Sequence, residues 1–449
     1  MMSSLRYACN NLSWLRYGSI ALQRCNLNRK LKWINSCRYI ERLYGTYPVK
    51  SEKTPLVKDL ISQIKADGPI SIASYMRQVL TGPMGGYYMS SDVFGSKGDF
   101  TTSPEVNQMF GELIGIWLYY QWMQTRPKSH AQIIELGPGR GTLSADILRT
   151  IKQFRNLQEG LSLHLVEISP KLSKIQEDTI CMHDTKTTQS VKELDVKPAG
   201  CYKALMSSDG IPIYWYYHLK DVPNNDYSLV VANEFFDALP IHQFRKVNGN
   251  WNEVMIDVDE GDGKHHLKFV LAPKPTLQTK LYTQDVMFAK SSKVKDIMEV
   301  SPDSATIYKE IADRLRVHGG CALIVDYGEF GTGTDTIRAF RKHKQIHVLD
   351  APGSADLTAD VDFAFLKYTV ENTVKFYGPI PQGQFLLQMG IQARLKMLIK
   401  ELEKSQRDDL LSAYYMLINP NKMGLRFKVA CMVYPGLGDP PGFGANTSI

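Results

Sequence analysis

The chain has 449 residues, of which 43% are hydrophobic, and a formal net charge of +7 at pH 7. A chain of this length and apolar content can bury a large core, as one enlarged domain or as two, which excludes disorder for most of it. No run of about 18 apolar residues occurs, so the sequence offers no candidate for a transmembrane helix.

The first 40 residues carry the whole of the net positive charge. They hold seven of the 53 Lys and Arg residues and no Asp or Glu, which leaves 46 basic and 46 acidic residues in the remainder. An Arg-rich segment without acidic residues is typical of a mitochondrial transit peptide, which we place at residues 1–46; a disordered basic arm is the alternative. The remainder is neutral and has no phosphate-neutralising field, so nucleic acid is not expected as a partner.

Four cysteines follow this segment, and they are widely scattered with no CxxC spacing. We therefore expect buried reduced thiols, and neither a disulfide framework nor a metal site. They are Cys181, Cys201, Cys321 and Cys431.

An N-terminal helical extension is predicted over residues 47–130. Apolar residues recur at helical spacing over residues 54–66 and again over 71–80, which predicts two helices. Residues 81–106 are dense in Gly, Ser and Pro and predict a long loop, and long loops in compact domains are often functional. The strongly apolar segment that begins at Met109 predicts a helix held between two layers.

From residue 131 onwards, short apolar runs alternate with helical patterns, and we place the core at residues 131–438. The predicted strands are 131–136, 161–168, 226–235 and 320–328, and the predicted helices between them include 142–154 and 306–315. This alternation favours a doubly wound parallel sheet, in which ligands bind at the carboxyl ends of the strands.

Other elements are predicted around these strands. Residues 242–300 are interpreted as an insertion with a hairpin whose polar turn lies at 260–263. Near the C-terminus we expect helices at 384–402 and 410–417 and a strand at 425–434, followed by a disordered tail at 439–449.

The first core strand runs into a glycine-rich turn with the pattern E-x-G-x-G-x-G, formed by Glu135, Gly137, Gly139 and Gly141. A P-loop would need a Lys after the last glycine, and a dinucleotide site would need the spacing G-x-G-x-x-G. A carboxylate under the turn would repel a pyrophosphate but suits a cationic ligand. The turn therefore predicts S-adenosyl-L-methionine (SAM) as the cofactor, with glycines that let the backbone approach it closely.

The second core strand ends in Glu167, where a βαβ unit places the carboxylate that accepts hydrogen bonds from two ribose hydroxyls. Together, this acid and the turn predict a SAM site. The alternative is a tight strand-to-helix turn and an incidental surface glutamate.

A polar group follows the apolar run 229–231 of the third predicted strand, beside the expected cofactor site. Asn233, Glu234 and Asp237 emerge there and are the candidate catalytic residues, because two carboxylates three residues apart can face one ligand. The structural alternative is that Asp237 caps a helix and Asn233 bonds locally.

Six motifs occur in a fixed order along the chain: GDFTTSPEV, ELGPGRGTL, NEFFDALP, LIVDYG, TADVDF and GQFLLQMGI. In this order and at these separations they resemble the MidA-type SAM-dependent methyltransferases, over residues 47–438. The resemblance implies a class I methyltransferase fold, which is an α/β doubly wound, Rossmann-like sheet, here with an N-terminal helical extension and an inserted hairpin region.

The mitochondrial members of that family are complex I assembly factors with protein arginine methyltransferase activity. The resemblance thus implies a mitochondrial matrix enzyme whose partner is a protein, a core matrix-arm subunit of respiratory complex I, and it implies no particular oligomeric state. An arginine acceptor stays protonated, with a pKa above about 12, so carboxylates such as Glu234 and Asp237 would orient it.

The loop motif GDFTTSPEV allows two interpretations. Asp99 and Glu105 would add acidic contacts if the loop closed over SAM, whereas Ser103 would merely cap a helix if the loop were a structural turn. Two other functions also remain open for the whole chain. One is a SAM-binding assembly chaperone without essential catalysis, and the other is a methyltransferase acting on a small quinone-like acceptor.

Overall fold

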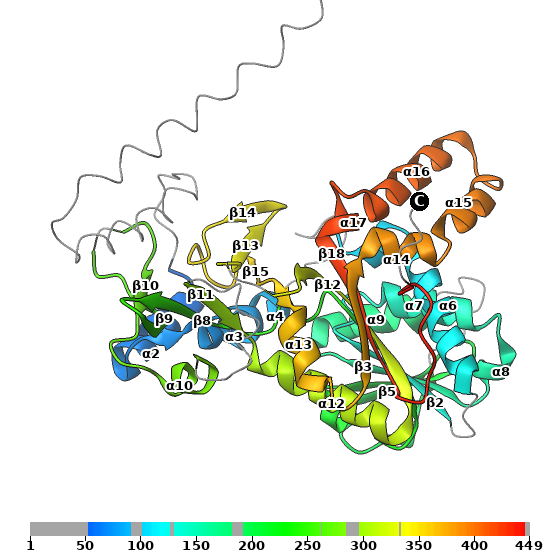
Figure 1. The fold of residues 1–449 in the computed structure, drawn as a ribbon, viewed down its shortest axis with the longest axis horizontal. Coiled ribbons are helices and arrows are strands. Elements are labelled where there is room, and N and C mark those ends of the chain that lie inside the picture. Colours follow the sequence, from blue (N-terminus) through cyan, green and yellow to red (C-terminus); the bar gives the residue numbers. More distant parts are fainter. Residues whose placement is uncertain are drawn as a thin grey trace, which may run out of the picture. The chain divides into compact units, whose positions relative to one another are not determined.

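The computed structural model describes residues 53–90, 101–125, 130–181, 192–261, 263–283, 296–331 and 334–444 (Figure 1). All of them lie in one compact unit, Lys50–Ile449. The predicted transit peptide at residues 1–46 lies outside the described residues. Among the helices that the structure describes, none is both long and apolar enough to cross a membrane.

Five parallel strands form the centre of a ten-stranded sheet. In spatial order they are β6 (Pro212–Tyr216), β3 (Leu161–Val166), β2 (Ala131–Leu136), β7 (Tyr227–Asn233) and β12 (Gly320–Glu329). The four predicted strands are all among them. From β2 the chain moves one way to β3, and it then returns to the other side of β2 to form β7. Such a switch point is where ligands bind in sheets of this kind, at the carboxyl ends of the strands.

The outer strands of this sheet are antiparallel, which corrects the prediction of a parallel sheet. On one side are β18 (Phe427–Val433) and β17 (Lys375–Pro381), and on the other are β5 (Lys203–Met206) and β4 (Lys192–Glu193). The short strand β16 (Val361–Asp362) pairs with the end of β12. An apolar run predicts a strand but does not fix its direction. The α/β doubly wound fold with helices on both faces is confirmed.

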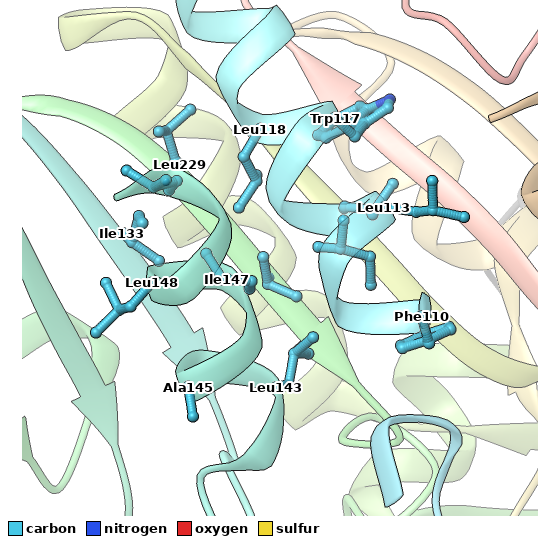
Figure 2. Close-up of a cluster of buried hydrophobic side chains, with 14 of the residues drawn as sticks. Phe110, Leu113, Trp117, Leu118, Ile133, Leu143, Ala145, Ile147, Leu148 and Leu229 are labelled. Atoms are coloured by element: carbon cyan, nitrogen blue, oxygen red, sulfur yellow. The ribbon is translucent and has the colours of Figure 1, made fainter. Parts of the chain in front are cut away.

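Helices cover both faces because alternate residues of each strand point to opposite sides. On one face, Ile133 of β2 belongs to the core cluster of α6 (Gln108–Thr125) and α7 (Thr142–Ile151), which Figure 2 shows. On the other face, Ile134 belongs to a cluster with α12 (Pro302–His318) and α13 (Phe363–Val370). Between β2 and β6 the chain also forms α8 (Arg155–Gln158) and α9 (Pro170–Cys181), and the turn η1 (Leu219–Asp221) follows β6.

The apolar helix α6 lies between layers, as predicted, because it contacts both β12 and the C-terminal helix α15 (Ile391–Ile399). Two glycines allow it to approach α7 closely. A Cβ on Gly111 would lie 2.4 Å from the Cβ of Asp146, and a Cβ on Gly115 would lie 3.0 Å from the Cβ of Thr150.

The N-terminal helices and the insertion share a separate apolar core. The predicted helices form as α2 (Pro55–Asp67) and α3 (Ile72–Thr81), and the predicted hairpin forms from β9 (Asn250–Val258) and β10 (Leu267–Leu271); its Asp262 lies outside the described residues. The same sheet contains β1 (Ile70–Ser71), β8 (His242–Val247) and β11 (Ile297–Val300), and α10 (Leu277–Thr283) follows β10. Figure 1 shows the blue helices beside the green strands.

A three-stranded sheet, which the sequence analysis did not predict, completes this core. It consists of β13 (Arg338–Arg341), β14 (Lys344–Ile346) and β15 (Asp356–Thr358). Buried residues of this sheet, such as Leu357, lie in one cluster with Leu60 of α2 and Ile256 of β9. We call α2, α3 and these two small sheets the accessory subdomain.

The C-terminal region differs from the prediction in two places. The helix expected at 384–402 is broken into α14 (Gln382–Gln388) and α15 at Gly390, whose φ of +86° is left-handed. Next come α16 (Lys404–Ile418), which was predicted, and the single turn α17 (Met423–Arg426). The prediction of a disordered tail was wrong for residues 439–444, because Trp117 Nε1 donates to Pro441 O at 3.1 Å and Tyr377 donates to Asp439 at 2.6 Å.

Candidate functional site

The glycine-rich turn joins the end of β2 to the start of α7. Gly137, Gly139 and Gly141 have φ values of +61°, +54° and +85°, a left-handed conformation that residues with a side chain rarely adopt. A Cβ on Gly137 would also lie 2.7 Å from Cδ2 of Phe235. The turn therefore requires glycine for both its backbone angles and its packing.

Glu135 lies beneath this turn, at the carboxyl end of β2, with a side chain that is almost completely buried. The Ser144 hydroxyl, on the first turns of α7, donates to its carboxylate. Burial raises the pKa of Glu135 to about 7, and the hydrogen bond from Ser144 opposes that rise. The carboxylate thus links the end of β2 to the start of α7, and next to the glycine-rich turn it carries either a negative charge or a proton.

Glu167, just beyond the end of β3, is held by two donors. Its Oε1 accepts from the backbone N of Ser169 at 2.7 Å, and its Oε2 accepts from Nε2 of Gln176 at 2.9 Å. Burial raises the pKa of Glu167 to about 7, and these donors oppose the rise. Its carboxylate is therefore fixed in orientation next to the glycine-rich turn.

Gln176 of α9, which the sequence did not reveal, connects the glycine-rich turn to Glu167. Its fully buried amide donates to Gly139 O at 2.8 Å as well as to Glu167, and it accepts from Trp215 Nε1 at 2.9 Å. All three hydrogen bonds come from one side chain that is locked in place by packing. Gln176 thus fixes the glycine-rich turn relative to Glu167.

The three candidate catalytic residues lie where β7 ends, as predicted. Asn233 is the last residue of β7, half-buried Glu234 adopts a left-handed φ of +52°, and Asp237 is 6% exposed. The backbone N of Glu234 donates to Val325 O in the neighbouring strand β12 at 2.8 Å. A non-glycine residue at this φ carries strain, which is common at functional sites.

Asp326 of β12 holds this strained segment in shape. Its Oδ2 accepts from the backbone N atoms of three successive residues, at 3.2, 2.9 and 3.3 Å, and these are Phe235, Phe236 and Asp237. Asp326 is completely buried. The sequence contained a signal for it, because it is the polar residue that follows the apolar run in the motif LIVDYG, and the preceding Val325 pairs with Asn233 at the end of β7.

The loop before α6 packs onto Glu234. Ser103, in the short helix α5 (Ser103–Val106), donates its backbone N to Glu234 Oε1 at 2.9 Å and its hydroxyl to Gln382 Oε1 at 3.0 Å. The Thr142 hydroxyl at the start of α7 donates to Glu105. Ser103 is therefore not the helix cap, which is Thr102. Asp99 lies outside the described residues.

The carboxyl groups in this region affect one another. Burial raises the pKa of Glu234 to about 8, with Asp237 adding to the rise, while the backbone N of Ser103 opposes it. Burial also raises the pKa of Asp237 to about 6, and burial together with Asp237 and Glu234 raises that of Asp326. A cation bound beside these closely spaced buried carboxyls would stabilise their charged form and lower their pKa values.

Two buried acceptors in this group have no hydrogen-bond partner among the described residues. They are Oδ1 of Asn233 and Oδ1 of Asp237. Asn233 is 8% exposed. Buried acceptors are almost always satisfied by a protein donor, water or ligand. A donor from water or from a ligand would satisfy these two oxygens.

The described residues contain no group of three or more His, Cys, Asp and Glu side chains that would hold a metal ion. Of the four cysteines, Cys181, Cys321 and Cys431 are buried thiols, as expected, whereas Cys201 is only half-buried.

The chain resembles proteins from several animals along most of its length. The Methyltransf_28 family, described as S-adenosyl-L-methionine-dependent methyltransferase, matches residues 113–380. The human protein named protein arginine methyltransferase NDUFAF7, mitochondrial, is 46% identical over 386 residues, 85% of this chain and 84% of the relative. The zebrafish protein of that name is 44% identical, with 83% of this chain and 85% of the relative covered.

Two solved structures from Burkholderia thailandensis share the fold. One, crystallised with S-adenosyl-homocysteine, has a TM-score of 0.67 at 20% identity and covers 86% of this chain and 93% of its own. The other has a TM-score of 0.66 at 21% identity, with coverages of 87% and 94%. At this level of identity the two structures establish a common fold only.

Proposed function

Because the chain belongs to the Methyltransf_28 family of SAM-dependent methyltransferases, we propose that it methylates an arginine side chain of a protein in the mitochondrial matrix. The proposal extends to the acceptor protein, a core matrix-arm subunit of respiratory complex I. Relatives at 44 to 46% identity whose names specify protein arginine methylation and mitochondria support the acceptor class and the organelle. The buried acidic group beside the cofactor region is the structural observation that carries the proposal.

SAM supplies a methyl group on a sulfonium, and the residues of the first two core strands fit this ligand. The left-handed turn of Gly137, Gly139 and Gly141 adds no side chain of its own, so its backbone can approach a ligand closely. Glu167 is oriented by two donors and retains lone pairs for ribose hydroxyls. Glu135 beneath the turn favours a ligand that carries positive charge. We propose these five residues as the cofactor-binding set.

Asn233, Glu234 and Asp237 are proposed to hold the acceptor. A guanidinium has five N–H donors and no acceptor, and the Oδ1 atoms of Asn233 and Asp237 are buried acceptors that lack donors among the described residues. A carboxylate pair fixes the plane of the guanidinium and places one nitrogen in line for displacement. A buried carboxylate is also suited to receive the proton that the methylated nitrogen loses.

The same acids argue against the alternative of a quinone-like acceptor. Such an acceptor needs an apolar pocket, whereas this region contains Glu234, Asp237 and Asp326 with raised pKa values. The chaperone alternative is separated from catalysis by experiment, because a chaperone would support complex I assembly fully without an acceptor-binding carboxylate.

The test is the substitution Glu234→Gln. The glutamine retains a side-chain oxygen for the Ser103 backbone N, so the loop contact survives, while the charge is lost. Weakening one charge-assisted pair costs about 1.5 to 3 kcal/mol, so methylation of complex I should fall at least about tenfold. Binding of S-adenosylhomocysteine, measured by calorimetry, should barely change.

A matched control is Glu193→Gln at the exposed edge strand β4, where the glutamate pairs with Lys197 at 2.9 Å. It should leave both measurements unchanged. If Glu234→Gln abolished S-adenosylhomocysteine binding, Glu234 would belong to the cofactor site. An unaltered methylation rate would assign it a purely structural role.

The proposed matrix location rests on residues 1–46, whose composition is that of a transit peptide. A reporter fused to these residues should reach the mitochondrial matrix in intact cells. Retention of the fusion in the cytosol would contradict the proposed location.

A further inference from the structure

Tyr88 and Asp356 form a hydrogen-bonded pair beside the acidic group, although neither belongs to a residue set proposed above. Tyr88 lies in the single turn α4 (Tyr87–Ser90), and its hydroxyl donates to Asp356 Oδ1 at 2.8 Å. Asp356 is the first residue of β15 and is only 6% exposed. The pair joins the loop after α3 to the three-stranded sheet of the accessory subdomain.

One side of this pair is fixed to the cofactor region. The Ser169 hydroxyl donates to the backbone O of Tyr88 at 2.7 Å. The backbone N of the same Ser169 donates to Glu167 Oε1 at 2.7 Å. A single serine therefore positions both Tyr88 and the acid proposed to hold the ribose.

The other side of the pair is fixed to the acceptor region. β15 ends at Thr358, and the next residue, Ala359, donates its backbone N to Asp237 O at 2.9 Å. Burial raises the pKa of Tyr88 well above its usual value, and the charges of Asp356 and then Asp237 raise it further. The phenol thus lies within the electrostatic influence of both carboxylates.

The Oδ1 atom of Asp237 lacks a hydrogen-bond donor, and this indicates what kind of ligand would bind between Asp237 and Asp356. Asp237 is 6% exposed, and this oxygen has no hydrogen-bond partner among the described residues. A guanidinium directs its N–H donors outward along different edges of its plane, so it binds best where carboxylates approach those edges from different directions. Asp237 follows β7, whereas Asp356 comes from the accessory subdomain.

We propose that Asp356 is a second acceptor-binding carboxylate, facing the substrate guanidinium from the accessory subdomain, and that Tyr88 is the residue that positions it. This inference rests on the proposed arginine methylation. It assigns selection of arginine over lysine to Asp356 together with Asp237, because a planar fork satisfies two separated carboxylates and a compact ammonium does not.

The decisive variant is Asp356→Asn, because its amide oxygen still accepts from the Tyr88 hydroxyl while the charge is removed. With purified protein, radiolabelled SAM and the matrix arm of complex I from mitochondria that lack this protein, KM for the matrix arm should rise at least about tenfold. The dissociation constant of S-adenosylhomocysteine should stay within about twofold of the wild-type value. Tyr88→Phe should raise KM in the same direction by a smaller factor, since the carboxylate remains but loses its positioning bond.

Two substitutions in the same subdomain serve as controls for structural damage. Tyr75→Phe removes a buried hydroxyl that donates to Val348 O at 2.9 Å, and Asp350→Asn removes a carboxylate bound by Arg341 at 3.0 Å. Both should leave KM unchanged, and thermal unfolding checks that each variant is folded.

The outcomes separate this inference from the proposed function. If Asp356→Asn keeps the wild-type KM while Glu234→Gln loses activity, the role of Asp356 is overturned and arginine methylation stands. An equal rise in KM for Asp350→Asn and Asp356→Asn overturns it as well, because the effect is then structural. If the wild-type protein transfers no methyl group to arginine in the matrix arm, the proposed function fails and this inference falls with it.

Discussion

Replacing Gln176 by Leu should both destabilise the fold and weaken cofactor binding. Leucine has a similar volume, so packing is nearly preserved, but three buried partners lose their hydrogen bonds: Gly139 O, Glu167 Oε2 and Trp215 Nε1. Each unsatisfied buried group costs about 1 to 3 kcal/mol. With partial relaxation, we expect the free energy of unfolding to fall by about 3 to 6 kcal/mol.

The consequence for binding follows from the same contacts. Without Gln176, Glu167 keeps backbone donors such as Ser169 N but loses its side-chain donor, and the glycine-rich turn loses this hydrogen bond to α9. The dissociation constant of S-adenosylhomocysteine should therefore rise at least about tenfold, which corresponds to roughly 1.4 kcal/mol. Urea denaturation measures the free energy of unfolding, and calorimetry on the folded variant measures the dissociation constant.

Gln121→Leu is a matched control, because it makes the same change at an equally buried position on α6. The Gln121 Nε2 atom has no hydrogen-bond partner among the described residues, and the side chain is 1% exposed. Its loss should change the free energy of unfolding by less than about 1 kcal/mol. If Gln176→Leu also cost less than about 1 kcal/mol, or left ligand affinity unaltered, the bridging role of Gln176 would be refuted.

Two further predictions concern packing and pH. Gly111→Ala should cost about 1 to 3 kcal/mol in urea denaturation, because its Cβ would lie 2.4 Å from that of Asp146, whereas Gly438→Ala, with no atom within 4 Å, should cost little. The pKa values of Glu135, Glu167 and Glu234 are raised by burial to about 7, 7 and 8, so the folded state binds these protons more tightly than the unfolded state. Their contribution to stability is present below the unfolded pKa and is lost as pH rises through 7 to 8. The urea midpoint of the ligand-free protein should therefore decrease as the pH is raised from 6.5 to 8.5. A midpoint that increases over this range would contradict the raised pKa values.

The sequence was sufficient to predict those helices and strands that a local pattern of apolar and polar residues defines. The four core strands are short apolar runs bounded by polar residues, and the flanking helices repeat apolar residues at helical spacing, so their positions were predicted. The glycine-rich turn, Glu135 and Glu167 were found for a related reason. In a doubly wound sheet, residues at the carboxyl ends of neighbouring strands must lie together, so their place in the chain already places them in space.

What the sequence did not reveal depends on contacts between distant segments. Gln176 is spaced four residues from both Leu172 and Ile180, so helical periodicity put it on the buried face, but nothing local identifies its three partners. The strands at 338–358 are short and partly charged, and they acquire a core only against α2, α3 and β9. The pair of Tyr88 and Asp356 joins positions that are 268 residues apart. The break at Gly390 did have a local signal, since glycine commonly ends a helix.

The shared core of the accessory subdomain has a consequence for the order in which the chain can fold. Ile70 of β1 pairs with Ile256 of β9, so helices α2 and α3 lie far ahead, in the chain, of the strands that cover their apolar faces. Contacts of such long sequence separation slow folding, because the loop between them must close first. The helices α2 and α3 are therefore among the last elements to be buried, and until then their apolar side chains are exposed to other proteins, including the chaperones that bind unfolded chains.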